Sequence, residues 1–151
     1  MGRKVNPIGF RLKINKTWEG RLYAEGKEYV DQLHQDFALR ELVRKVAPRA
    51  GISRIEIERF PGKVKIAVHT AKPGVLIGRK GESVKKLRQQ LEAMVGKKID
   101  LEIKEIKSPD LDSFLVASNI AEQLERRISY QRAMKRSIQQ AMRQGAEGIR
   151  V

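Results

Sequence analysis

The chain of 151 residues contains no cysteine and only two histidines. Disulfides and cysteine metal sites are therefore excluded, and two histidines are too few for most zinc sites. Aromatic residues make up 5% of the chain, so base stacking is not expected to dominate a contact with nucleic acid. No apolar run approaches the roughly 18 residues of a membrane span, and the N-terminus lacks the apolar stretch of a signal peptide. We expect a soluble protein of a reducing compartment, with no metal, no other cofactor and no membrane partner.

Acidic residues are scarce beside basic ones. The chain has 32 Lys and Arg against 18 Asp and Glu, a net charge of +14, and its pI is near 10.3. Residues 1–24, 72–98 and 126–151 contain 21 of the basic residues and only 4 of the acidic ones. A uniformly solvated surface does not need that segregation. The pattern predicts an anionic partner that meets three basic segments.

Hydrophobic periodicity predicts an α+β domain over residues 21–107. Apolar residues recur at spacings of three to five between residues 28 and 46, which is typical of a helix that covers a core. Asp36 stands where it could cap a break, so this segment is interpreted as one helix or two.

The period then changes to two over residues 53–60 and 63–70. Pro61-Gly62 between them indicates a turn, so the pair is expected to form a β-hairpin. A helix over residues 82–95 and a third strand that begins at Ile99 follow. Together they predict a three-stranded sheet with helices on one face.

A glycine-flanked pair of cations stands between an apolar run and the helix at residues 82–95. Glycine turns tightly and lets another backbone approach, and amides at a helix N-terminus favour an anion. The candidate residues for holding a phosphate backbone are Gly78, Arg79, Lys80 and Gly81, with Lys85 and Lys86 in the helix behind them. The G-x-x-x-x-G-K-[ST] pattern is missing and nothing resembles an activated nucleophile, so no enzyme is expected.

Residues 108–151 predict the start of a second α+β domain. Ser108 is expected to cap its first helix, a break is expected near Ser129, and a second helix follows over residues 132–144. Residues 148–151 read as a first strand without a partner, which predicts that the chain is a truncated piece of a longer one. The candidate RNA-binding cations of this part are Arg126, Arg127, Arg132, Lys135, Arg136 and Arg143.

Residues 1–20 predict a basic N-terminal arm. Pro7 argues against a long helix here, while Phe10 and Trp18 favour an ordered segment over a frayed terminus. Its candidate RNA contacts are Arg3, Lys4 and Arg11.

The order helix, strand, strand, short helix, G-x-x-G, helix, strand resembles that of a type II KH domain. Several motifs in the same order resemble one ribosomal protein family, that of the third protein of the bacterial small subunit. These motifs are Gly2–Leu12, His69–Gly74, Gln123–Arg127, Arg132–Arg136, Gln139–Arg143 and Gly148–Val151.

The resemblance implies a structural constituent of the head of the small ribosomal subunit, in the cytoplasm or in an organelle. The arm and the KH surface would bind ribosomal RNA and neighbouring proteins of the head. Arg132, Lys135 and Arg136 would line the mRNA entry path and help to hold or unwind mRNA. Where the family often has two adjacent arginines this chain has Gln131-Arg132, which removes one charge from that face.

Two other functions fit parts of the pattern. A free-standing KH-type RNA-binding regulator or ribosome-assembly factor is equally compatible with the G-x-x-G loop, although the arm and the second basic helix favour a protein embedded in a large RNA. A basic membrane-surface binder needs an exposed apolar face, and the apolar stripes here are expected to be used by the core.

Overall fold

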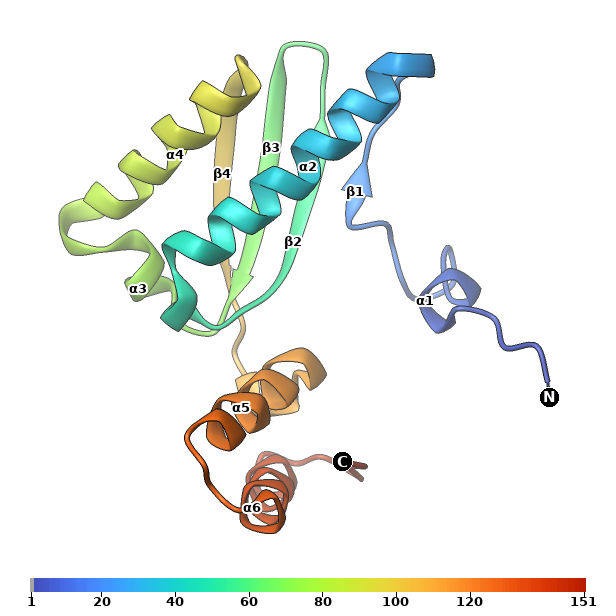
Figure 1. Ribbon diagram of the computed structural model, residues 1–151, viewed down its shortest axis with the longest axis vertical. Helices are drawn as coiled ribbons and strands as arrows, with labels where there is room; N and C mark the ends of the chain where they lie inside the picture. The colour runs from blue at the N-terminus through green and yellow to red at the C-terminus, as the bar shows by residue number, and fades with distance from the viewer. Residues whose placement is uncertain (1) are drawn as a thin grey trace.

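The computed structural model describes residues 2–151, and Figure 1 shows a layer of sheet and helices, a helical pair below it and an N-terminal arm beside it. The helices are α1 (Pro7–Phe10), α2 (Gly26–Val46), α3 (Pro73–Ile77), α4 (Glu82–Val95), α5 (Ser113–Glu125) and α6 (Tyr130–Arg143). The strands are β1 (Gly20–Arg21), β2 (Ile52–Arg59), β3 (Lys63–Thr70) and β4 (Lys98–Glu105).

The strands form one sheet in the order β1-β2-β3-β4. β2 and β3 make the expected antiparallel hairpin, and β1 and β4 each pair in parallel with the inner strand beside them. The prediction of three strands was wrong by one, because Gly20 and Arg21 pair with Ile57 and Glu58. A strand of two residues is too short for an alternating pattern to reveal it. The division of the chain at residues 20 and 107 stays a prediction.

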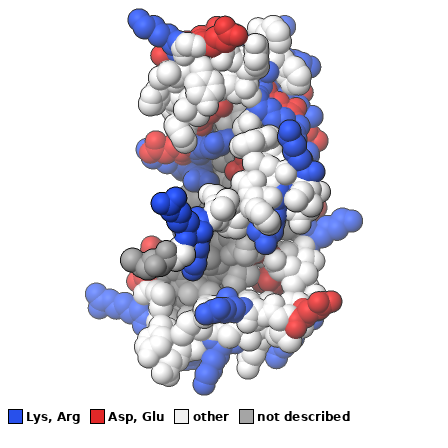
Figure 2. Space-filling view, turned by 90° about the vertical axis from the view of Figure 1, so that its right-hand side faces the viewer, with Lys and Arg blue, Asp and Glu red and all other residues white. Residues whose placement is uncertain are grey.

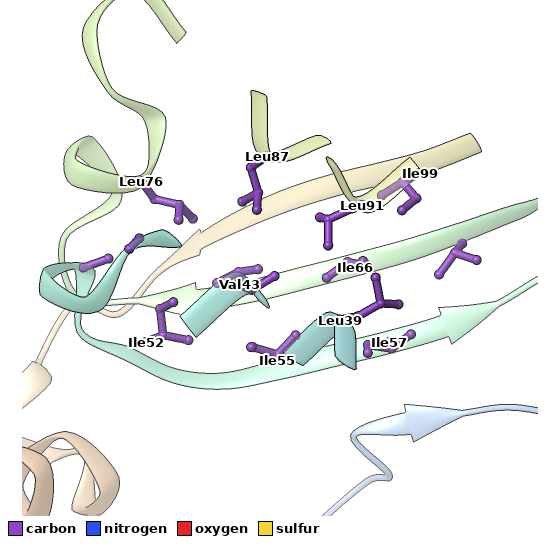
Figure 3. Packing of buried hydrophobic residues seen from close by; sticks show 14 residues of the cluster. Leu39, Val43, Ile52, Ile55, Ile57, Ile66, Leu76, Leu87, Leu91 and Ile99 are labelled. Atoms are coloured by element: carbon purple, nitrogen blue, oxygen red, sulfur yellow. The ribbon is translucent and has the colours of Figure 1, made fainter. Parts of the chain in front are cut away.

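The core lies between the sheet and the helices α2 and α4, which cover the same face (Figures 1 and 3). Alternation along β3 sends Val64, Ile66 and Val68 into this core. A register shift in β2 between Ile52 and Arg54 allows Ile52 to join the same core. The remaining members are Leu39, Val43, Ala47, Ala50, Ile55, Ile57, Leu76, Leu87, Leu91 and Ile99. These predicted elements therefore form around one apolar layer.

Helix α2 is continuous, so the segment is one helix and not two, and Asp36 caps no break. Asp36 is buried, and its carboxylate accepts from Arg59 Nε at 2.9 Å and from Arg59 Nη2 at 2.7 Å. The same guanidinium donates to Gln35 Oε1 and to the carbonyl oxygen of Gln32. Asp36 therefore holds the middle of α2 to the end of β2 instead of capping a helix.

Within residues 2–151 no helix covers the opposite face of the sheet (Figure 1), and charged side chains lie on it. Lys65 Nζ lies 3.1 Å from Glu102 Oε2, and His69 Nε2 lies 3.2 Å from Glu56 Oε1. Arg54 Nε lies 3.3 Å from the same oxygen of Glu56. Because acids pair with cations across this face, it offers little net charge to an anionic partner.

His69 should make stability depend on pH below about 6.5. Burial lowers the pKa of its imidazole from 6.5, and the Arg54 guanidinium acts in the same direction. Between that lowered value and 6.5 the unfolded chain binds a proton that the folded chain does not, so the free energy of unfolding falls as the pH falls through this window. Chemical denaturation from pH 7.5 to 5 should show a smaller fall for His69→Gln. Equal falls for the two proteins would contradict this assignment.

The first helix of the second part is capped by Asp112, not by Ser108 as expected. Asp112 Oδ1 accepts from the amides of Phe114 and Leu115, at 3.0 and 3.1 Å. Its other carboxylate oxygen accepts from Ser53 Oγ on β2 at 2.7 Å. One side chain therefore both begins α5 and ties it to the sheet.

Helices α5 and α6 pack together and are separated at Ser129, as expected. The buried positions of α6 are Ala133, Ser137 and Ala141, which are small and permit close packing. Residues 148–151 pair with no strand within residues 2–151, so the first strand of the second domain stays a prediction. Within residues 2–151, no helix has the length and apolar character needed to cross a membrane.

Candidate nucleic-acid interface

The glycine loop joins α3 to α4 and has an unusual backbone. Gly78 has φ 71° and ψ −175°, and Lys80 and Gly81 are both left-handed. The resulting tight turn leaves the side chains of Arg79 and Lys80 exposed at its tip. Among the described residues no side chain caps the N-terminus of α4, which starts at Glu82. Uncapped amides and two exposed cations together favour an anion at this point.

Position 78 requires glycine for two reasons, namely its positive φ and the closeness of the Ser83 side chain. A Cβ at this position would overlap Ser83 Oγ and would lie 2.8 Å from Ser83 Cβ. The first turn of α4 is thus packed directly against the loop. A Cβ on Gly81, in contrast, would meet nothing within 4 Å.

The surface around the loop carries both cationic side chains and exposed apolar side chains. Lys85 and Lys86 are exposed one turn into α4, and no ion pair engages them within the described chain. Val75 and Ile77 of α3 are 49% and 40% exposed beside the loop. Phosphates could therefore meet cations while the apolar parts of a nucleotide meet α3.

Helix α6 carries a second cationic face. Arg132, Lys135 and Arg136 lie at positions i, i+3 and i+4, which one side of a helix shares. They line a shallow hollow of about 520 Å³ together with Ser129, Gln131 and Gln139. Arg143 is exposed farther along the helix and does not line the hollow. The amides and the hydroxyl in this hollow were not predicted as site residues, although the spacing of Gln139 from Arg132 places both on one side of α6.

Arg126 and Arg127 lie in the turn between α5 and α6 but differ from each other. Arg126 has φ −78° and forms an ion pair with Glu122. Arg127 has φ +61° and an exposed side chain. Sequence reasoning treated the two arginines alike, and the structure separates them.

The arm is locally ordered although its side chains are exposed. Asn6 Oδ1 accepts from the amides of Ile8 and Gly9, which caps the short helix α1. Arg11 Nη1 donates to the carbonyl oxygen of Pro7 at 3.1 Å. Arg3 and Lys4 are exposed ahead of this helix.

The predicted residues do not converge on one site. The glycine loop lies to the left of the molecule in Figure 1, α6 lies at the bottom and the arm lies to the right. Figure 2 views the molecule from the arm side and shows Lys and Arg projecting at separate places, with Asp, Glu and uncharged surface between them. Three dispersed basic regions suit an extended polyanion better than a small anionic ligand.

Comparison with known proteins shows which family this chain resembles. A model of the KH domain matches residues 38–111, and a model of the C-terminal domain of ribosomal protein S3 matches residues 120–151. Small ribosomal subunit protein uS3 of Akkermansia muciniphila is 50% identical over 153 residues, which cover 100% of this chain and 67% of the relative. The chain belongs to the uS3 family.

Two other uS3 proteins show the same extent of similarity. That of Roseobacter denitrificans is 50% identical over 151 residues, which cover 100% of this chain and 64% of the relative. That of Rhodospirillum centenum is 52% identical and is covered to 67%. This chain thus spans about two thirds of the length of these uS3 proteins.

Membership of the uS3 family confirms the expected KH domain and the expected family. The relatives are named as ribosomal proteins and not as enzymes, which agrees with the expectation of no catalysis. Among residues 2–151 there is no cluster of three or more His, Asp or Glu side chains that could hold a metal ion.

Proposed function

We propose that this chain is a structural, RNA-binding constituent of the head of the small ribosomal subunit. The observation that carries the proposal is the presence of two separate cationic faces, on the glycine loop and on α6, in a chain of the uS3 family. The glycine loop and the arm contact ribosomal RNA, and neighbouring proteins of the head cover other parts of the surface. Most of the affinity comes from the release of counterions by phosphates.

The α6 face is proposed to line the mRNA entry path. Arg132, Lys135 and Arg136 present their charges together around an open hollow that a single strand can enter. Gln131 stands beside them and contributes hydrogen-bonding groups in place of a charge. The face therefore holds mRNA and assists its unwinding with one cation fewer than a pair of adjacent arginines would supply.

RNA binding by the chain, measured against salt concentration, tests the two faces separately. Arg79→Asp/Lys80→Asp and Arg132→Ala/Lys135→Ala are each expected to lower the affinity for protein-free small-subunit RNA by about tenfold or more and to flatten the salt dependence. Lys65→Ala is the matched control, because Lys65 is paired with Glu102 on the charged sheet face.

The outcomes discriminate between functions. If only Arg79→Asp/Lys80→Asp lowers the affinity for RNA, the chain acts as a simple KH module. That result would contradict a second RNA-binding face on α6. Retention of affinity in both variants would show that the basic segments serve something other than RNA.

A further inference from the structure

Three residues other than glycine have a left-handed backbone within residues 2–151, and all three are cations. They are Lys13 with φ +66°, Lys80 with φ +52° and Arg127 with φ +61°. A residue with a Cβ pays a conformational cost there that glycine avoids, and the residues that best tolerate the conformation are Asn, Asp and His. Lys and Arg supply only 32 of the 151 residues, so composition alone does not account for a cation at every such position.

Each of the three cations lies at a turn in a different basic segment. Around Lys13, the carbonyl oxygen of Arg11 accepts from the amides of residues 14–16, and the amide of Lys13 donates to the carbonyl oxygen of Lys16. Around Arg127, its own amide donates to the carbonyl oxygen of Leu124. Backbone hydrogen bonds therefore hold the left-handed turns, and the charged ends of the side chains are not needed for them.

The side chains of Lys13, Lys80 and Arg127 are all exposed. Within residues 2–151, none of them forms an ion pair with an acidic side chain. Arg126 is different, because its backbone is relaxed and Glu122 already neutralises it. Strain retained at an unpaired, exposed cation indicates that the charge serves a contact outside the chain.

We propose that Lys13 and Arg127 are primary phosphate contacts, as Lys80 is in the glycine loop, and that Arg126 is not. The inference rests on the proposed RNA-binding function and makes it more specific. It adds Lys13 to the RNA-binding residues of the arm. It also distinguishes Arg127, which contacts phosphate, from its neighbour Arg126, which pairs with Glu122.

Glycine substitutions test the inference because they should move stability and affinity in opposite directions. Lys13→Gly and Arg127→Gly are expected to raise the urea midpoint of unfolding, since the left-handed conformation no longer carries a cost. The same variants are expected to bind protein-free small-subunit RNA about three- to tenfold more weakly. Each substitution should also lower the salt slope by about 1, because one cation fewer neutralises a phosphate.

Arg127→Gln and Arg126→Gln complete the experiment. Arg127→Gln should weaken binding without raising the urea midpoint, and Arg126→Gln should leave the affinity within about twofold of the parent. Equal losses for Arg126→Gln and Arg127→Gln would overturn the inference, as would unchanged binding by Lys13→Gly and Arg127→Gly. A lower midpoint for Arg127→Gly would assign the side chain to the fold instead. If the parent itself shows no salt-dependent RNA binding, the proposed function fails before this inference is reached.

Discussion

Replacement of Asp36 by alanine is expected to lower the free energy of unfolding by about 3–5 kcal/mol. The side chains of Asp36 and Arg59 are only 5% and 7% exposed. Removal of the carboxylate leaves a buried guanidinium with two neutral oxygen acceptors, from Gln35 and Gln32, and no opposite charge. This loss of stability reflects the uncompensated buried charge of Arg59 more than the net contribution of the Asp36–Arg59 pair.

Urea unfolding followed by circular dichroism measures the effect. Glu41→Ala is the matched control on the same helix, because Glu41 pairs with Lys45 in solvent and should cost less than about 1 kcal/mol. Asp36→Leu/Arg59→Met should recover much of the stability, since apolar replacement of both partners removes the buried charge. A loss for Asp36→Ala no larger than that for Glu41→Ala would contradict the buried pair.

Gly78→Ala is the second substitution with a large expected effect, about 2–5 kcal/mol on the native loop. The new Cβ would overlap Ser83 Oγ, and φ of 71° is unfavourable for alanine. The loop can relieve part of this free-energy cost by moving. Such a movement displaces Arg79 and Lys80 from their native positions. We therefore expect RNA affinity to fall by about tenfold or more, since 1.4 kcal/mol corresponds to tenfold.

Gly81→Ala separates conformation from contact in the same loop. Its φ is +77° but nothing surrounds the added Cβ, so only the conformational cost of about 1–2 kcal/mol is expected. Ser83→Gly introduced into Gly78→Ala should restore part of the stability and affinity by removing the overlap. If Gly78→Ala behaves like Gly81→Ala in both measurements, the contact with Ser83 does not constrain the loop.

Elements with a strong local period could be predicted from the sequence. The hairpin and α4 were placed correctly because Val64, Ile66 and Val68 alternate and because Leu87 and Leu91 stand one helical turn apart. The G-x-x-G loop followed from its position between such elements. Local spacing carries this information without knowledge of the rest of the fold.

Features that depend on distant partners could not be predicted in this way. Asp36 was interpreted as a possible cap from its local sequence alone. Its actual partner, Arg59, is 23 positions away, and no local pattern reveals that contact. Asp112 replaces Ser108 as the cap of α5 while it also binds Ser53, 59 positions away. Local preference made a cap at Asp36 possible and favoured a cap at Ser108, and tertiary contacts decided against both.

The candidate RNA-binding residues were predicted by charge and motif, and charge alone does not distinguish neighbours. Arg126 and Arg127 are the same amino acid in adjacent positions. Only the backbone angles and the ion pair with Glu122 separate them. The roles of the individual cations therefore remain predictions for the substitutions described above.

The parallel pairing of β1 with β2 has a consequence for synthesis of the chain. Gly20 and Arg21 are made before Ile57 and Glu58, the residues beside which they lie in the sheet. A nascent chain is synthesised from its N-terminus towards its C-terminus, so the arm exists before the strand with which its root pairs. During that interval the root of the arm has no strand to pair with, and the position of the basic arm relative to the rest of the chain is not fixed. Completion of the hairpin ends the interval by fixing the root of the arm to the sheet.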